Sequence, residues 1–252
     1  MAPSVYDPTP DGGAADPFPG LTAVMPALNE EGSIGAVITA LQRVGVRRIV
    51  VGDNDSTDRT AEIARGLGAI VVRAHPRGYG SACRAAALAV PAGTRAVVFC
   101  DADGADQLEK LGELAGPVLA DQCDLVIGSR VLGRQQAGAL SPPQRFGNLL
   151  AAALMRWLYR ARVTDLGPFR CVSSAALERL RMEDLGYGWT TEMQVKAFRL
   201  DLRYREIAVD ARLRIAGESK ISGRLVPVFR AGYAILSTIW RYRRAHLPGA
   251  VR

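Results

Sequence analysis

The chain has 252 residues, 48% of them hydrophobic, which is enough to bury a full core in one large domain or two small ones. Its formal net charge of +7 is placed unevenly, since residues 203–244 carry ten Lys or Arg against three acidic residues. This basic excess indicates an anionic partner, and composition leaves open a phosphate-bearing substrate, a membrane surface or nucleic acid. The longest apolar runs, 149–155 and 231–240, fall short of the roughly 20 residues that span a bilayer, so we expect no transmembrane helix.

The first 20 residues are rich in Pro, Gly and Asp and lack the basic and apolar regions of a signal peptide. We therefore expect a flexible tail over residues 1–20. The four cysteines show no CxxC spacing, which argues against a zinc site and a disulfide framework; they stand at positions 83, 100, 123 and 171. This pattern favours a reducing, cytoplasmic setting.

Short β-rich runs alternate with helical stretches from Leu21 onward. The patterns predict strands at 21–28, 48–53, 69–74, 96–103 and 124–130, with helices between them at 31–43, 57–67, 79–90 and 107–120. Apolar strands separated by amphipathic helices predict an α/β fold with a Rossmann-like, mainly parallel sheet that carries helices on both faces. Beyond residue 140 we expect helices, one strand pair within 202–214, and an amphipathic helix over 224–244.

Three carboxylates, Asp101, Asp103 and Asp106, follow the apolar run that ends at Cys100. Like charges this close repel one another unless a divalent metal ion or an Arg cluster lies between them. Asp106 also stands just before the next predicted helix, and capping that helix is the role that we expect for it.

Seven polar motifs occur in order along these elements. They are PALNEE (26–31), DNDSTDRT (53–60), RGYGSA (77–82), DAD (101–103), GSR (128–130), TDLGPFR (164–170) and RIAGESK (214–220). Over roughly residues 21–240 the chain resembles family 2 glycosyltransferases of the GT-A fold, nearest the polyprenyl-phosphate sugar transferases such as dolichyl-phosphate mannose synthase. The resemblance implies an inverting, metal-dependent hexosyltransferase with a catalytic domain at 21–222 and an amphipathic helix and tail at 223–252.

In that family the DxD carboxylates hold Mg²⁺ or Mn²⁺ against the diphosphate of a nucleotide-sugar, so the resemblance makes Asp101 and Asp103 metal ligands and Asp103 catalytic. It also implies that eight further residues bind the donor: Pro26, Ala27, Asn29, Glu30, Asp53, Arg77, Gly78 and Gly80. By analogy we expect a uridine diphosphate sugar, with glucose first. Ala105 replaces a Gln of the family pattern, and Asp55 replaces a common Gly.

The resemblance places five basic or hydroxyl residues where relatives handle the acceptor phosphate: Arg130, Arg170, Arg214, Ser219 and Lys220. A phosphate acceptor is already an anion, whereas a hydroxyl acceptor needs a base, for which Asp165 and Glu192 are the candidates. Gly167 and Pro168 stand where lipid-phosphate relatives commonly have Ser-Gly. The sequence thus leaves open a lipid-phosphate and a small hydroxyl acceptor.

Other interpretations fit the sequence less well. A dinucleotide-binding loop lacks its third glycine at Cys83 and follows the third strand instead of the first. A non-catalytic nucleotide-sugar-binding protein would not need the acceptor motifs. The C-terminal aromatics have the spacing of a packing helix, so we expect no nucleic-acid partner.

The helix at 224–244 allows two readings. With Trp240 and Tyr242 at its boundary, it could lie peripherally on anionic lipid at the cytoplasmic membrane face, or it could pack on the catalytic domain. The sequence leaves this choice and the oligomeric state open.

Overall fold

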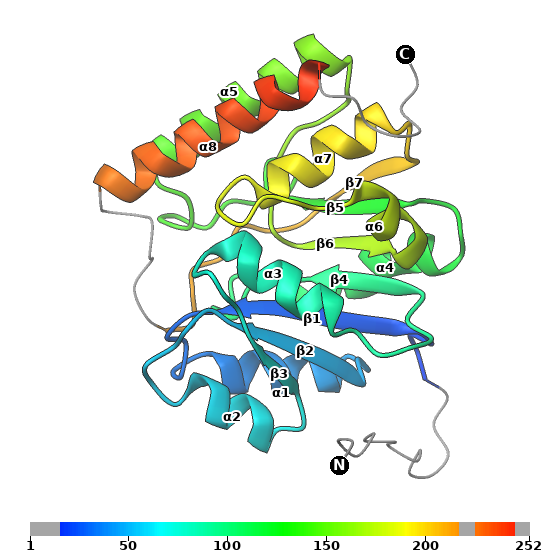
Figure 1. Cartoon of the computed structure of the whole chain (residues 1–252), viewed down its shortest axis with the longest axis vertical. Helices are drawn as coiled ribbons and strands as arrows, with labels where there is room; N and C mark the ends of the chain where they lie inside the picture. Colours follow the sequence, from blue (N-terminus) through cyan, green and yellow to red (C-terminus); the bar gives the residue numbers. More distant parts are fainter. Residues whose placement is uncertain (1–15, 217–224, 245–252) are drawn as a thin grey trace.

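The computed structural model describes residues 16–216 and 225–244 (Figure 1). Ser219, Lys220, most of the expected N-terminal tail at 1–20 and residues 245–252 lie outside the described residues. The centre of the structure is a seven-stranded sheet in the order β3-β2-β1-β4-β6-β5-β7. Only β6 runs antiparallel, between β4 and β5. The strands are β1 (Leu21–Ala27), β2 (Arg48–Asp53), β3 (Ile70–Arg73), β4 (Ala96–Phe99), β5 (Leu125–Ser129), β6 (Arg170–Ser173) and β7 (Tyr204–Ala208).

Helices cover both faces of the sheet, as the alternating pattern predicts. One hydrophobic core lies between the sheet and the helices α1 (Ile34–Arg43), α2 (Thr60–Gly66) and α4 (Leu111–Leu119). The core on the opposite face lies under α3 (Tyr79–Leu88), α6 (Ser174–Leu180) and α7 (Trp189–Arg199). In α1, the buried residues Ile34, Val37, Ile38 and Leu41 follow the three- and four-residue spacing of one helix face.

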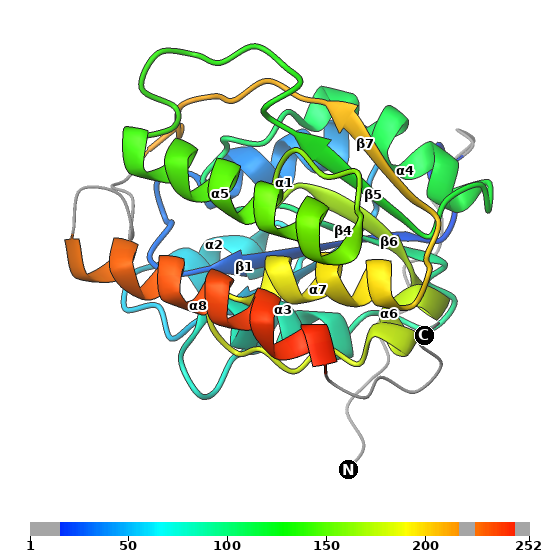
Figure 2. The same ribbon diagram turned by 90° about the horizontal axis from the view of Figure 1, so that it is seen from above.

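Two long helices form a further layer outside α7. They are α5 (Pro142–Tyr159) and α8 (Leu225–Arg244), and they lie side by side in both views (Figures 1 and 2). A third core joins them to α7, with Met155 from α5, Val195 from α7 and Ile239 from α8 among its buried members. Within the described residues, no helix combines the length and apolar character needed to cross a membrane.

Two expected elements are corrected. The range 202–214 forms the single strand β7 instead of a strand pair, because residues beyond it bind loops: the Asp210 N–H donates to Gln107 Oε1 (2.7 Å) and the Ile215 N–H to the Asp103 carbonyl (2.9 Å). The expected helix at 107–120 starts with a short 3₁₀ turn, η1 (Leu108–Lys110), and becomes α-helical at Leu111.

Candidate active site

A cavity of about 590 Å³ opens at the edge of the sheet where the parallel strands end. Asp101, Asp103 and Asp106 follow β4 and line one side of it, while Arg130 follows β5 and Arg214 comes from the segment after β7. Ligands of open α/β sheets bind at this edge, because the loops that follow the strands converge there. The fold therefore brings together the acidic motif and two of the basic residues that the sequence nominated.

The acidic loop is held by its own backbone. The Asp101 N–H donates to Asp106 Oδ2 (2.8 Å), and the Ala105 N–H donates to Asp103 Oδ1 (2.9 Å). The hydroxyl of Tyr79 donates to Asp101 Oδ1 (3.1 Å). We expected Asp106 to cap the next helix, and this expectation is wrong. Its side chain turns back to the loop and lines the cavity.

The carboxylates of this loop are short of compensating charge. Burial, and then the charge of Asp103, raise the pKa of Asp101 to about 7. Burial, followed by the charges of Asp101 and Asp103, also raises the pKa of Asp106 well above its usual value. Hard oxygen ligands with excess negative charge fit Mg²⁺ or Mn²⁺, which relieves the repulsion between them.

In residues 16–216 and 225–244, no three His, Cys, Asp or Glu side chains are arranged to hold a metal ion by themselves. Mg²⁺ commonly binds through one or two carboxylates together with substrate phosphates. An arginine also reaches the loop: Arg214 Nη2 lies 3.0 Å from Asp103 Oδ2, and its Nη1 lies 3.5 Å from Glu30 Oε1.

The loops after β1 and β2 are tied together beside the cavity. Asn29 Oδ1 accepts from the Thr57 N–H (2.8 Å), and the Glu30 N–H donates to Thr60 Oγ1 (2.8 Å). Asp53 ends β2, and Pro26 and Ala27 end β1, paired in register with Gly52 and Asp53. These nominated donor residues, with Arg77, lie outside the cavity lining. Asp55 adopts φ 65°, a left-handed conformation that glycine adopts most readily.

Gly78 and Gly80 are required by packing against the loop at 183–188. A Cβ on Gly78 would lie 2.1 Å from the Leu185 carbonyl oxygen, and one on Gly80 would lie 2.2 Å from the Asp184 carbonyl oxygen. The Gly80 N–H donates to the Gly186 carbonyl (3.0 Å), and the Gly78 N–H to Asn54 Oδ1 (2.7 Å). These contacts fix the start of α3, which carries Tyr79 into the cavity.

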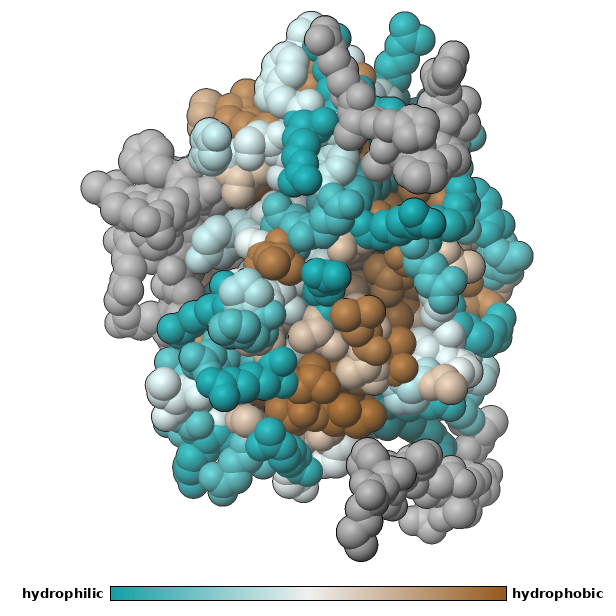
Figure 3. All heavy atoms as spheres, viewed as in Figure 1, coloured by the Kyte–Doolittle hydropathy of each residue, from teal (hydrophilic) through white to brown (hydrophobic). Residues whose placement is uncertain are grey.

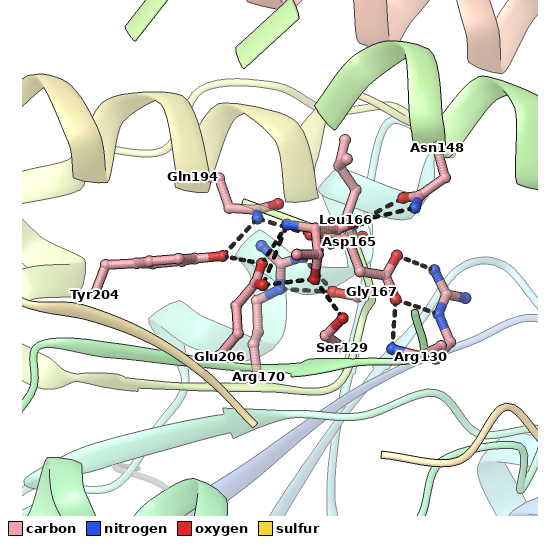
Figure 4. A network of polar contacts seen from close by, with 11 residues as sticks. Ser129, Arg130, Asn148, Asp165, Leu166, Gly167, Arg170, Gln194, Tyr204 and Glu206 are labelled. Atoms are coloured by element: carbon pink, nitrogen blue, oxygen red, sulfur yellow. Dashed lines mark hydrogen bonds and ion pairs between the residues drawn. The ribbon is translucent and has the colours of Figure 1, made fainter. Parts of the chain in front are cut away.

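Arg130 and Asp165 form a two-pronged ion pair (Figure 4). Arg130 Nε and Nη2 each lie 2.8 Å from a carboxylate oxygen of Asp165, and the Arg130 N–H also donates to Asp165 Oδ2. Burial raises the pKa of Asp165, but the charge and hydrogen bonds of Arg130 outweigh it and hold this pKa below its usual value. Asp165 therefore stays ionised and paired, so the structure does not support the role of base that we considered for it.

Comparison with known proteins decides the family. Residues 22–181 match the model described as Glycosyl transferase family 2. This chain belongs to glycosyltransferase family 2.

An uncharacterized glycosyltransferase of Mycobacterium tuberculosis is 39% identical to this family 2 enzyme over 206 residues, which cover 81% of this chain and 91% of the relative. The dolichyl-phosphate hexose transferase of Haloferax volcanii is 33% identical over 211 residues, with 81% and 87% covered. Glucosyl-3-phosphoglycerate synthase from M. tuberculosis, solved with Mn²⁺, uridine diphosphate and phosphoglyceric acid, superposes with a TM-score of 0.71 at 23% identity, covering 90% of this chain and 79% of that one. This likeness confirms the GT-A fold.

We expected Arg170 at the acceptor site of this family 2 enzyme, and the structure places it elsewhere. It is fully buried and donates to the carbonyls of Leu166 and Gly167 (Figure 4) and to that of Thr190. The reason is its place at the start of β6, which inserts antiparallel between β4 and β5, so that the guanidinium ties β6 to the loop before it. We correct its role from phosphate contact to loop support.

Glu192 is also corrected from a candidate base to a structural carboxylate. It is fully buried in α7, 2.7 Å from Lys196 Nζ, and it accepts from the Asp184 N–H (2.8 Å) and the Tyr242 hydroxyl (2.7 Å). A carboxylate surrounded in this way cannot reach a substrate hydroxyl.

Several cavity residues were missed by sequence reasoning. Tyr79 stands inside the RGYGSA motif, where the two glycines drew attention instead, while the others belong to none of the seven motifs: Gln107, Tyr187, Thr190 and Asp210. A polar residue next to a tight glycine turn was the one available signal, and it applied only to Tyr79.

Proposed function

We propose that this glycosyltransferase is an inverting, metal-dependent hexosyltransferase that moves a sugar from a uridine diphosphate sugar, with glucose first, to a polyprenyl-phosphate-type acceptor. Asp101 and Asp103 would hold Mg²⁺ or Mn²⁺, and Asp53 would accept a hydrogen bond from the uracil N3–H. A bound divalent cation neutralises the charge that develops on the departing uridine diphosphate. The solved synthase with Mn²⁺ and uridine diphosphate and the acid-rich loop of this chain support the donor assignment.

The composition of the cavity carries the acceptor assignment. Its basic side chains, Arg130, Arg212 and Arg214, stand near the acidic loop and suit a phosphate group. Apolar side chains line other parts of the same cavity: Leu140, Leu166, Pro168, Leu213 and Ile235. A phosphate joined to a hydrocarbon chain matches both kinds of lining.

The state of the two candidate bases supports an acceptor that brings its own negative charge. Asp165 is paired with Arg130, and Glu192 is buried with Lys196 and Tyr242. An oxygen of the acceptor phosphate would attack the anomeric carbon from the face opposite the leaving group, forming the new C–O bond as the bond to uridine diphosphate breaks. Because the attacking oxygen carries no proton near neutral pH, the step needs no base.

One transfer assay tests the proposal. The purified enzyme with UDP-glucose and Mn²⁺ is offered a short-chain polyprenyl phosphate, 3-phosphoglycerate or glycerol, and products are identified by mass spectrometry and the anomeric NMR signal. We expect the lipid phosphate to be glucosylated with inverted configuration. Transfer confined to a hydroxyl acceptor would instead favour a cytosolic enzyme acting on small molecules.

Donor identity needs its own measurement. Thermal-shift experiments with UDP-glucose, UDP-N-acetylglucosamine and GDP-mannose, each with Mn²⁺, compare the stabilisation that each ligand gives. We expect the uridine nucleotides to stabilise the chain. A shift confined to GDP-mannose would overturn the uridine assignment, and binding without turnover on any acceptor would indicate a non-catalytic nucleotide-sugar-binding protein.

A further inference from the structure

Helix α5 has an unusually apolar outer face. Phe146 is 69% exposed, Leu149 55% and Trp157 69%, and the exposed Ala153 lies between them. Their spacing of three and four residues places them in one stripe along the helix. Soluble proteins seldom leave such a contiguous stripe of large apolar side chains in water, so it marks an interaction surface.

The inner side of the helix pair is packed. The inner face of α5 buries Ala151, Ala152 and Met155 against α7 and α8, and the Tyr159 hydroxyl donates to the Ile239 carbonyl of α8. In α8 itself, Tyr242 is only 3% exposed, so of the two interpretations that the sequence left open for this residue, packing on the domain holds and an interfacial anchor does not.

Exposed aromatics remain on α8 seven residues apart, at Tyr233 (76%) and Trp240 (50%). The space-filling view shows apolar surface at the level of the α5–α8 pair, near its top (Figure 3). Among the side chains whose exposure the structure describes, more of the exposed large apolar ones lie on α5 than on α8, and the sequence gave α5 no interfacial role.

The charged side chains on α5 and α8 themselves are all basic. From residue 125 to residue 164 the chain has six Arg and no acidic residue, and residues 219–252 also contain no acidic residue. Arg145, Arg156 and Arg160 are exposed on or next to α5, and Arg241 and Arg243 are exposed on α8. Apolar and aromatic side chains bordered by arginines match the surface of a bilayer that contains anionic lipid.

We propose that the outer stripe of α5 (Phe146, Leu149, Ala153 and Trp157), flanked by arginines, is the surface that holds the enzyme on anionic membranes. α8 then contributes Tyr233 and Trp240 at the margin and mainly braces α5 from within. The start of α5 also borders the cavity, through Ser141 and Gln144, as does Ile235 of α8. An enzyme held by α5 therefore has its cavity next to the lipid surface.

This inference rests on the proposed function in one respect: a lipid-phosphate acceptor explains why the enzyme would need a membrane-binding surface. Membrane binding is therefore measured without donor or acceptor. Sedimentation with phosphatidylcholine vesicles, with and without one third phosphatidylglycerol, is compared at about 0.05 M and about 0.5 M salt, since surface attraction is screened over this range. We expect wild type to bind the anionic vesicles and to lose much of this binding at high salt.

The triple variant Phe146→Ser/Leu149→Ser/Trp157→Ser should bind at least tenfold more weakly. Leu88→Ser is the matched control, because Leu88 is a 77% exposed leucine on α3 and should leave binding unchanged. The charge arm compares Arg145→Gln/Arg160→Gln, which should weaken binding, with Arg43→Gln/Arg65→Gln, exposed arginines on α1 and α2 that should not. Melting temperature and UDP binding verify that each variant is folded.

Three results would overturn the assignment. In the first, wild type stays in the supernatant at low salt; in the second, the triple variant binds vesicles as well as wild type does. In the third, both pairs of arginine substitutions weaken vesicle binding equally. Light scattering adds a fourth: if wild type is a dimer and the triple variant a monomer, a second copy of the chain covers the stripe instead of lipid. If the enzyme binds membranes but transfers no sugar to a lipid phosphate, the assignment of this surface is supported and the proposed acceptor is refuted.

Discussion

The two halves of the sheet differ in how their functional residues are held. In the half formed by β3, β2, β1 and β4, side chains of the strand-end loops accept from nearby N–H groups, either of the next loop, as Asn29 does from Thr57, or of the same loop, as Asp106 does from Asp101. In the half formed by β6, β5 and β7, charged side chains reach across long sequence separations into buried pairs, as Arg130 does with Asp165 and Glu192 with Tyr242.

This difference shows why similar motifs have different meanings in the two halves. A loop that follows a parallel strand lies at the ligand-binding edge of the sheet, whatever packs beside it. The topology of the sheet alone therefore makes its residues face the ligand. A charged residue on β6 or α7 is instead placed by the layer packed on it. In this enzyme α7 covers Arg170, whose guanidinium donates to the Thr190 carbonyl, and α8 covers Glu192 through Tyr242, so both become internal supports.

The largest effect should come from the acidic loop. Asp103→Asn removes a charge from the group proposed to hold the metal ion, and we expect kcat/KM to fall by about 10³-fold, since a metal ion contributes several kcal/mol to transition-state stabilisation. Chelation of divalent metal should reduce the wild-type rate to a similar level. Glu113→Gln, which removes an exposed carboxylate on α4, is the control and should retain full activity. Full activity in excess chelator would refute the metal assignment.

The ion pair between Arg130 and Asp165 should give the next largest effect, on stability as well as on transfer. Arg130→Ala leaves the charge of Asp165 buried and unpaired, so the free energy of unfolding should fall by about 3 kcal/mol in urea titrations. The double variant Arg130→Ala/Asp165→Asn removes that charge and should regain part of the stability while transfer stays low. Recovery of both together would mean that Arg130 acts only through the fold.

The pH dependence of this pair has a defined sign. Because the pKa of Asp165 is lowered in the folded chain, its pairing stabilises the fold above the unfolded pKa of about 3.9 and is lost as the pH falls through the folded value. The stability difference between wild type and the double variant should therefore shrink in acid. An unchanged difference at low pH would indicate a cause other than charge.

The contrast between the halves also describes what sequence reasoning could reach. The first five strands along the chain, the helices between them and the gathering of Asp101, Asp103, Arg130 and Arg214 were predictable, because apolar periodicity and strand-end motifs are local signals. The burial of Arg170, Glu192 and Tyr242 was not, since it depends on which helix packs on which. The segment after β7 had a strand-like composition, but its Asp210 and Ile215 N–H groups bind loop residues of the other half, Gln107 and Asp103.

A backbone contact between the halves should show a smaller effect. Gly80→Ala puts a Cβ 2.2 Å from the Asp184 carbonyl oxygen, so the loop at 183–188 must move away from α3. We expect a loss of about 2 kcal/mol in stability and weaker UDP binding by calorimetry. Gly66→Ala is the matched control, because a Cβ there meets nothing within 4 Å. Equal effects of the two substitutions would show that helix propensity, and not this contact, is responsible.

The smallest effect tests whether α8 reaches the donor side through the same loop. Tyr242 donates to Glu192, Glu192 accepts from the Glu183 and Asp184 N–H groups, and the loop that follows accepts from the Gly80 and Ser81 N–H groups at the start of α3. Tyr242→Phe removes one hydroxyl from this series.

A buried hydrogen bond contributes about 1 kcal/mol, so if the loop transmits the loss, Tyr242→Phe should weaken UDP binding by up to about fivefold. Tyr159→Phe removes a different hydroxyl bond to α8, the one to the Ile239 carbonyl, without touching Glu192. It should lower the melting temperature comparably while leaving the UDP dissociation constant unchanged. If both variants weaken UDP binding equally, α8 supports the donor site only through general stability, and the two halves communicate through no specific contact of Tyr242.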